Sequence, residues 1–192
     1  MGFTFQYFEN LTALNLGYNL IQIIEKNAFH GLHLLQRLHL EHNSLQVLPI
    51  GMFNKLNCLQ DLSIEHNKLQ SRQDDQMKET SKILSLRTLS FDIHPDFKFP
   101  SEWSTLSHLN NLNIYARSTK VQFNKEMFAH IGTIQITSLH LNLVPSISED
   151  SITVQVSDDL PKNPISQVFR SFAVVKSGNM TNIEIAYSRI DY

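Results

Sequence analysis

Residues 35–45 read Leu-Gln-Arg-Leu-His-Leu-Glu-His-Asn-Ser-Leu, and this stretch decides the fold. Its four leucine positions, filled by leucine or isoleucine, and its asparagine recur in residues 11–21 and 59–69, a period of 24 residues. A helix would place apolar residues three and four apart throughout, and a lone strand would alternate without a fixed asparagine. A repeat of this length instead predicts a solenoid, in which each repeat buries its apolar face against its neighbours.

The spacing also predicts the local geometry of each repeat. Along a short strand successive side chains alternate, so Leu38 and Leu40 point inward and His39 points outward. An asparagine follows where the chain turns off each strand, and its buried amide can pair backbone groups that the turn leaves open. This is the leucine-rich-repeat pattern. We therefore expect an α/β fold: a right-handed leucine-rich-repeat solenoid, or horseshoe, with a parallel concave β-sheet and an irregular convex side.

We expect one leucine-rich-repeat domain over residues 1–192, truncated at both ends. Phe5 and Phe8 match the tail positions of a repeat whose strand is missing, the sequence stops shortly after Met180 opens another, and no polar cap is evident. In residues 145–179 two degenerate repeats and one repeat with an insertion both fit. The expected divisions are regular repeats 11–70, irregular repeats 71–144, a degenerate region 145–179 and the start of a further repeat 180–192.

Composition narrows the classes of function. The formal net charge of −2 over 192 residues gives a nucleic-acid ligand no support. The single cysteine, Cys58, excludes a disulfide framework and a cysteine-rich zinc site, and we expect its thiol to be buried. Because no G-x-S-x-G, H-E-x-x-H or phosphate-loop motif occurs, we predict no enzyme, no catalytic residue and no cofactor. No run of about 18 apolar residues and no signal-peptide pattern occur, so we expect no membrane contact by this segment.

The outward positions of the concave sheet are the candidate ligand-binding residues. A rigid sheet presents them at strand spacing, about 4.8 Å apart. They form either a ligand surface or a merely solvated face, and the sequence leaves both open. The candidates are Arg37, His39, Glu41, His42, Asp61, Ser63, Glu65 and His66.

Two histidines give this surface its most specific feature. His42 and His66 occupy the same column, next to a column with Glu41 and Glu65. Imidazoles gain charge between pH 7 and 5, so the column could recruit an anionic ligand in an acidified compartment. Simple duplication of Glu-His-Asn also explains the column, and it is the simpler explanation. His39 and His42 are three positions apart at a strand's end without a third ligand, so we predict no metal site.

Asn10 and Asn179 each open an Asn-x-Thr sequon. Both lie just before the first apolar residue of an expected strand, outside the concave face. A glycan there would leave that face open, and we expect glycosylation of both if the chain is secreted.

Residues 8–19, Phe-Glu-Asn-Leu-Thr-Ala-Leu-Asn-Leu-Gly-Tyr-Asn, resemble the ectodomain repeats of Toll-like receptors, as do residues 97–109. The resemblance implies a ligand-recognition module of an innate immune receptor, in the extracellular or endosomal-lumenal part of a single-pass membrane protein. Its ligand would be a protein or another microbial molecule, and it would act by binding and by dimerising, with itself or with another leucine-rich-repeat receptor. The alternative is a structural or adhesion scaffold for protein interactions. An intracellular adaptor is the third possibility.

Overall fold

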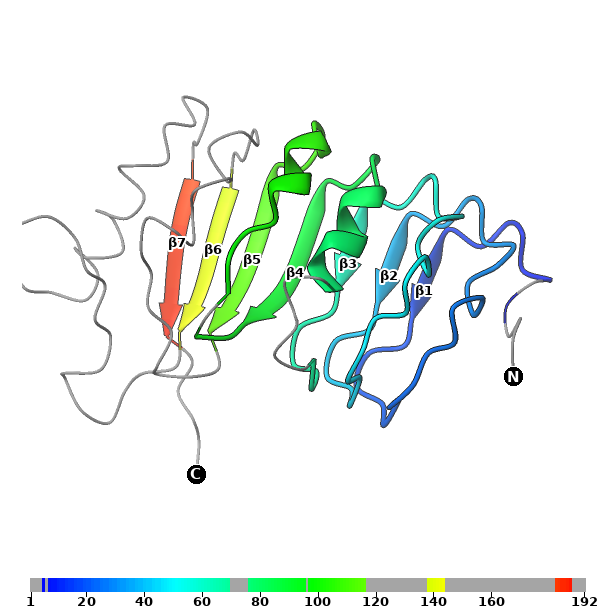
Figure 1. Cartoon of the computed structure of the whole chain (residues 1–192), viewed down its shortest axis with the longest axis horizontal. Helices are drawn as coiled ribbons and strands as arrows, with labels where there is room; N and C mark the ends of the chain where they lie inside the picture. Colours follow the sequence, from blue (N-terminus) through cyan, green and yellow to red (C-terminus); the bar gives the residue numbers. More distant parts are fainter. Residues whose placement is uncertain are drawn as a thin grey trace, which may run out of the picture.

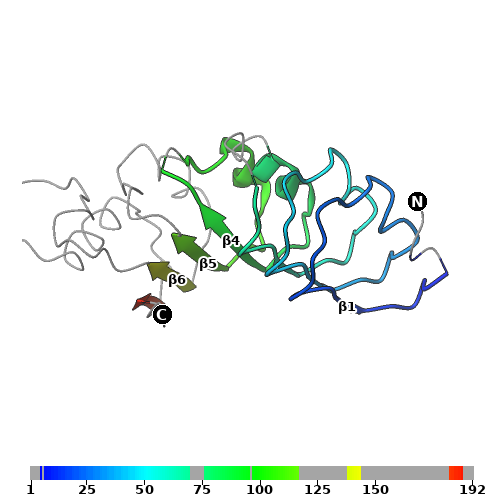
Figure 2. The same cartoon turned by 90° about the horizontal axis from the view of Figure 1, so that it is seen from below.

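The computed structural model describes residues 5, 7–69, 76–95, 97–116, 138–143 and 182–187. Its strands lie side by side in chain order in one parallel sheet, with the connecting segments on the other side (Figures 1 and 2). This is the predicted leucine-rich-repeat solenoid. The strands are β1 (Ala13–Asn15), β2 (Arg37–His39), β3 (Asp61–Ser63), β4 (Thr88–Ile93), β5 (Asn111–Ala116), β6 (Ser138–Leu143) and β7 (Asn182–Tyr187).

The strand register places equivalent repeat positions next to each other. Leu38 pairs with Leu14 on one side and with Leu62 on the other, and the same row continues through Leu89 and Leu112. From Leu38 onward these leucines are fully buried, whereas Leu14 in the first repeat is only partly buried. The core therefore consists of stacked layers of one residue type, and each layer needs a neighbouring repeat to cover it.

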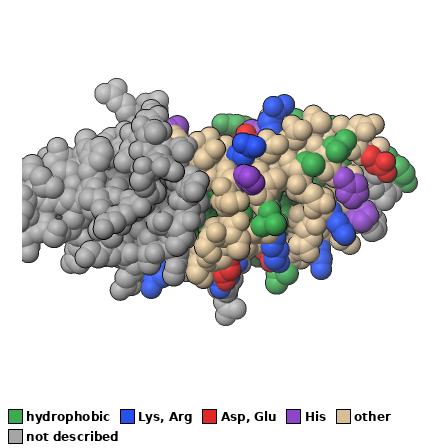
Figure 3. Space-filling model, turned by 90° about the horizontal axis from the view of Figure 1, so that it is seen from above, with side chains coloured by type: hydrophobic (Ala, Val, Ile, Leu, Met, Phe, Trp, Pro, Cys, Tyr) green, Lys and Arg blue, Asp and Glu red, His purple; other side chains and the backbone are tan. Residues whose placement is uncertain are grey.

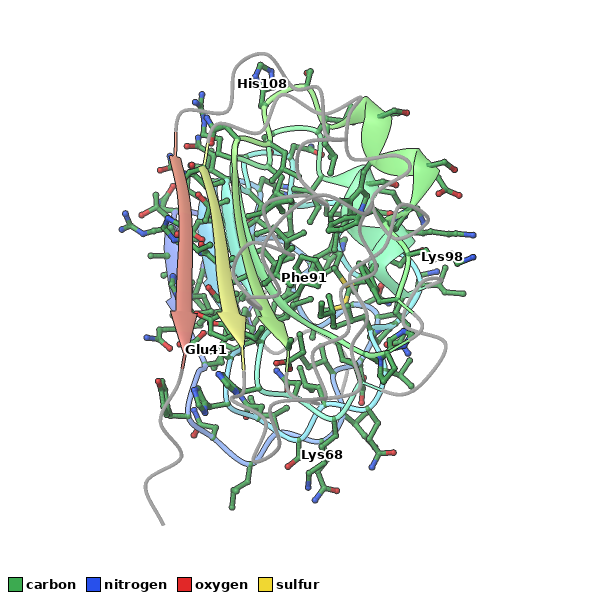
Figure 4. The ribbon with its side chains drawn as sticks, turned by 90° about the vertical axis from the view of Figure 1, so that its left-hand side faces the viewer. Glu41, Lys68, Phe91, Lys98 and His108 are labelled. Carbon is green, nitrogen blue, oxygen red and sulfur yellow. The ribbon has the colours of Figure 1, made fainter. Side chains whose placement is uncertain are left out.

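Two short 3-10 helices, η1 (Lys78–Lys82) and η2 (Ser101–Thr105), lie on the convex side. Trp103, in the position of the repeat phenylalanine, is fully buried as expected, and its Nε1 donates to the carbonyl oxygen of Met77 at 3.2 Å. Its ring packs edge-on against Phe91 and Phe99 at centroid distances of 5.6 and 5.5 Å. Figure 4 shows Phe91 in the interior, between the sheet and the convex wall. Lys98 lies on that convex wall. Aromatic packing thus fills the longer repeats.

The predicted asparagine function is confirmed in two repeats. The amide of Asn43 donates to the carbonyl oxygens of Leu16 (2.9 Å) and Leu40 (3.1 Å) and accepts from the backbone N–H of Ile21 (2.9 Å). Asn67 is equally buried and forms the equivalent hydrogen bonds to its own repeat and to the preceding one. One side chain thus ties two successive repeats together through backbone groups.

The last two described strands are neighbours in the sheet: β6 pairs directly with β7, and Ser138 lies opposite Asn182. The region 145–179 itself, with the sequon at Asn179, lies outside the described residues. Within the described ranges, no helix has the length and apolar character needed to cross a bilayer.

Candidate ligand-binding face

Three columns of side chains run across the solvent-facing side of the sheet, each made by equivalent positions of successive strands. The first contains Arg37 and Asp61, and the second contains His39 and Ser63. The third lies two residues further along each strand, where Asp92 pairs with Tyr115. Extending the register of the shorter strands gives its earlier members. The third column is Gly17, Glu41, Glu65, Asp92 and Tyr115.

Four aromatic rings stand beside the third column, and we call them the ring ladder: Tyr18, His42, His66 and Tyr115. The Tyr18 and His42 rings stack at 4.3 Å between centroids, with 14° between their planes. His42 and His66 stack at 4.1 Å and 22°, and Tyr115 closes the ladder against His66 at 5.1 Å in a T-shaped contact. The ladder therefore links four repeats, and Tyr115 reaches past the repeat of β4.

The backbone at the ladder explains how these rings come to stack. Tyr18, His42 and His66 have positive φ angles of 56°, 52° and 56°, in the left-handed region. In this region histidine is enriched among non-glycine residues. The backbone N–H of Tyr18 donates to the carbonyl oxygen of Glu41 at 2.9 Å, and that of His42 to Glu65 at 3.0 Å. Each ring is thus held at the same height, one strand spacing from the next.

Three carboxylates lie within the third column, and we call them the carboxylate row: Glu41, Glu65 and Asp92. Glu65 is only 8% exposed. The Oε2 atoms of Glu41 and Glu65 are buried and accept no hydrogen bond from the described residues, although Glu41 Oε2 lies 3.6 Å from His39 Nδ1. Asp92 Oδ2 accepts from the backbone N–H of Asn67 at 3.2 Å. The row therefore places acceptors where the surrounding chain supplies few donors.

Burial is the main cause that raises the pKa of Glu65, from 4.5 to about 7. Its own backbone N–H opposes this shift, and the carboxylates of Glu41, Asp92 and Asp61 add to it. Burial also raises the pKa of Tyr115, and the charges of Glu65 and Asp92 raise it further. The row is thus a partly desolvated region of like charge, in which the ionised form of each acid disfavours that of the next.

The predicted site residues lie together on this face, but not all are accessible. Arg37 and His42 are exposed, and His39, Glu41, Asp61 and His66 are half-buried. Burial raises the pKa of Asp61, while His39 and Arg37 lower it.

Ser63 and Glu65 are each only 8% exposed, which corrects the expectation of solvent-facing side chains. Ser63 is short and lies between His39 and Ser90 on the neighbouring strands. Glu65 is flanked by the other two carboxylates. At strand spacing, such neighbours cover a side chain even on the open side of a sheet.

The repeat frame places Tyr18, Asp92 and Tyr115 among the outward positions of the sheet, but the candidate list did not include them. Tyr18 shares its repeat position with His42 and His66, so the column itself carried that signal. The frame did not indicate that Tyr115 contacts the rings, since it belongs to the carboxylate column and reaches them sideways.

In the first two outward columns of β4 and β5 the side chains are neutral and bond to one another. Asn113 Nδ2 donates to Ser90 Oγ at 2.9 Å, and Asn111 Nδ2 lies 3.4 Å from Thr88 Oγ1. The concave face therefore has an acidic and aromatic half over β1–β4 and a neutral hydrogen-bonding half over β4 and β5. On the edge of the solenoid seen from above, by contrast, side chains of every kind are interspersed (Figure 3).

The remaining predictions concern a metal ion, a glycan and a thiol. His42, considered above as a metal ligand, stacks in the ring ladder. In the part of the chain that the structure describes, no group of three or more His, Cys, Asp or Glu side chains could hold a metal ion. Asn10 is exposed in the turn before β1, so its sequon is accessible. Cys58 is half-buried rather than buried, which corrects the expectation for this thiol.

Comparison with known proteins agrees with the repeat. The model of the leucine-rich-repeat family matches residues 2–45 and 34–87. No curated protein matches the chain. Among solved structures it is similar to an internalin, InlF, from Listeria monocytogenes (17% identity, 95% of this chain and 63% of that one, TM-score 0.46). It is also similar to internalin C2 from the same organism (13%, 93% and 82%, 0.45) and to a leucine-rich-repeat protein from Leptospira interrogans (18%, 93% and 61%, 0.43). The chain thus spans less than two thirds of the length of the first and the third of these proteins.

Proposed function

We propose that this leucine-rich-repeat protein is a protein-interaction module and that it binds its partner on the concave face. One observation carries the proposal: the ring ladder and the carboxylate row stand in register across adjacent strands of one sheet. A surface that combines fixed aromatic rings with polar groups suits recognition of another protein, because rings contribute contact area at little entropic cost.

The two halves of the face support a protein rather than a small ligand. Charged and aromatic groups lie over β1–β4, and amides and hydroxyls lie over β4 and β5. Paired across the strands, these groups form one extended surface of polar and aromatic side chains. Extended, polar and partly aromatic surfaces are typical of protein–protein contacts, whereas small-molecule sites are concave and mostly apolar.

Site-specific photo-crosslinking tests this proposal. A photoreactive residue replaces Arg37, which is exposed on the concave face, and in a matched variant it replaces Lys98, which is exposed on the convex side (Figure 4). A partner captured from Arg37 alone is purified, and its affinity is measured for the Arg37→Ser and Lys98→Ser variants. We expect about tenfold weaker binding for the first and no change for the second. Equal losses, or a partner captured only from Lys98, would place binding elsewhere.

A finer proposal follows from the motif in residues 8–19, which resembles Toll-like receptor repeats: an extracellular or endosomal-lumenal receptor segment that dimerises on ligand binding. The exposed sequon at Asn10 supports a secreted location, since a glycan there would project from a turn outside the concave face. Sequencing the transcript in both directions tests it. A downstream membrane span with an intracellular TIR domain supports the receptor, and matrix domains or a direct stop support the adhesion scaffold.

A further inference from the structure

We propose that the carboxylate row, together with the ring ladder, is a binding site for a guanidinium group, the side chain of an arginine on the partner protein. This inference rests on the proposed function and adds the chemistry of the contact. It assigns to Glu41 and Glu65 the role of acceptors and to the rings the role of a neighbouring contact surface.

The first argument is the unsatisfied acceptor. Glu65 is more than nine-tenths buried, and its Oε2 accepts no hydrogen bond from the described residues. A buried polar atom without a partner is costly, and native structures keep few of them. The Oε2 of Glu41, in the preceding repeat of the same column, also accepts no hydrogen bond from the described residues, although His39 Nδ1 lies 3.6 Å away. Two such acceptors at adjacent positions call for a donor that the described residues do not supply.

The second argument is charge. The groups that act on Glu65 are its own backbone N–H and three carboxylates, those of Glu41, Asp92 and Asp61. Arg37 and His39 act on Asp61 in the first column, and His39 Nδ1 also lies 3.6 Å from Glu41 Oε2. The side-chain charges that act on Glu65 are therefore all negative, and a cation from outside would relieve this repulsion as well as form hydrogen bonds.

The third argument selects guanidinium among cations. Its planar fork carries five N–H donors, so one group can serve two carboxylates on neighbouring strands. The ring ladder lies directly beside the row, but its rings already stack on one another at 4.1 and 4.3 Å, so they give the cation a contact edge and not a stacking face. A metal ion needs a converging cage of ligands, and the described residues contain no such group.

Access to the row lies at its β1 end. Gly17 occupies the column position next to Glu41 and carries no side chain there. A Cβ built on Gly17 would lie 2.7 Å from Glu41 Cδ, so the Glu41 carboxylate occupies the space that this glycine leaves. His42, beside the row, is exposed to solvent. Gly17→Ala therefore displaces the Glu41 carboxylate while it leaves every charge in place.

The proposal also fixes the sign of the pH dependence. A cation binds the ionised row, so its affinity rises as Glu65 loses its proton near pH 7. Around Glu65 the titratable groups are Glu41 and His42 from the β2 repeat, Asp61 and His66 from its own, and Asp92 and Tyr115 from β4 and β5. An anionic ligand held by the histidine column would show the opposite trend.

The test uses the full chain, labelled with 15N and 13C, and NMR titration with the peptide acetyl-Gly-Arg-Gly-amide. The same peptide with citrulline in place of arginine is the uncharged control of equal shape. We expect the arginine peptide to shift the His42 and His66 ring signals and the Glu65 amide signal. Its affinity should rise about tenfold between about pH 5.5 and about pH 8, and the citrulline peptide should bind at least about tenfold more weakly.

Three variants locate the site. Glu65→Gln and Gly17→Ala should each weaken arginine binding about tenfold, and Glu102→Gln, an equal charge change on the convex η2, should leave it unchanged. Thermal melts of each variant show that the chain stays folded. Equal binding of citrulline, tighter binding at low pH, or full affinity in Glu65→Gln would overturn the proposal. If a concave-face partner is captured from Arg37 but the arginine peptide fails, the interaction module stands and the guanidinium site does not.

Discussion

Replacement of Glu65 by glutamine should stabilise the protein at neutral and alkaline pH. Glutamine keeps the size of the side chain but removes the charge. The pKa of Glu65 is raised in the folded chain from 4.5 to about 7, chiefly by burial. A raised pKa contributes stability that is fully present below pH 4.5 and is lost as the pH rises through about 7. A shift of this size costs the folded wild type about 3 kcal/mol once the carboxylate is ionised.

We therefore expect Glu65→Gln to exceed the wild type by up to about 3 kcal/mol in free energy of unfolding at about pH 8. The difference should shrink as the pH falls toward 4.5, where the wild-type carboxyl is protonated in both states. Trp103 is the only tryptophan and is fully buried, so its fluorescence during urea titration reports unfolding. Glu102→Gln is the control: the pKa of Glu102 is lowered, mainly by its own backbone N–H, so this change should not stabilise the chain at any pH.

A difference between Glu65→Gln and wild type that stays constant from about pH 5 to about pH 8 would refute the reasoning, because linkage requires it to follow the titration of Glu65. So would a variant less stable than wild type at high pH. In that case the carboxylate would have a compensating partner in the folded state.

Three further substitutions test the packing that positions the site. Asn67→Ala should lower the free energy of unfolding, measured by urea titration, by about 3 kcal/mol, because it leaves buried backbone groups of two repeats unpaired. Asn19→Ala, on an exposed asparagine, should lower it by less than about 1 kcal/mol. Trp103→Ala should lower the free energy of unfolding by about 3–5 kcal/mol, measured by circular dichroism, through the cavity it leaves; a loss below about 1 kcal/mol would contradict its burial. Glu79→Ala removes the acceptor of the Gly51 N–H at 2.7 Å and should lower the melting temperature more than Glu102→Ala, since Glu79 is buried and Glu102 is exposed; equal shifts would count against this.

The repeat pattern predicted most of the fold because it states a contact rule directly. The spacing of Leu38, Leu40 and Asn43 fixes which side chains enter the core and which amide ties two repeats together, and both were confirmed. The longer strand β4 could not be predicted in the same way. The repeat pattern does not state where a strand ends, and the contact of Phe91 with Trp103 inside this repeat is likewise not contained in a one-dimensional pattern.

The candidate site was predicted in part. The histidine column is a property of the repeat, so His42 and His66 could be paired from their positions alone. The burial and raised pKa of Glu65 depend on carboxylates of other strands, and the reach of Tyr115 to His66 depends on geometry across β4. The narrower assignment to a Toll-like receptor stays a proposal, because the family that matches is the leucine-rich repeat in general.

The positive φ angles of the ring ladder have a practical consequence for mutagenesis. A non-glycine residue in the left-handed region carries a backbone cost that glycine does not, so the chain pays for each ring it presents there. His42→Gly would remove the central ring yet relax its own backbone. Loss of the ring stacking destabilises the fold, whereas relief of the backbone cost stabilises it, so the two effects offset each other in folding. Both the missing ring and the freer backbone weaken recognition. Position 42 is therefore where binding can be deleted and folding kept, a separation that alanine scanning of this face would conceal.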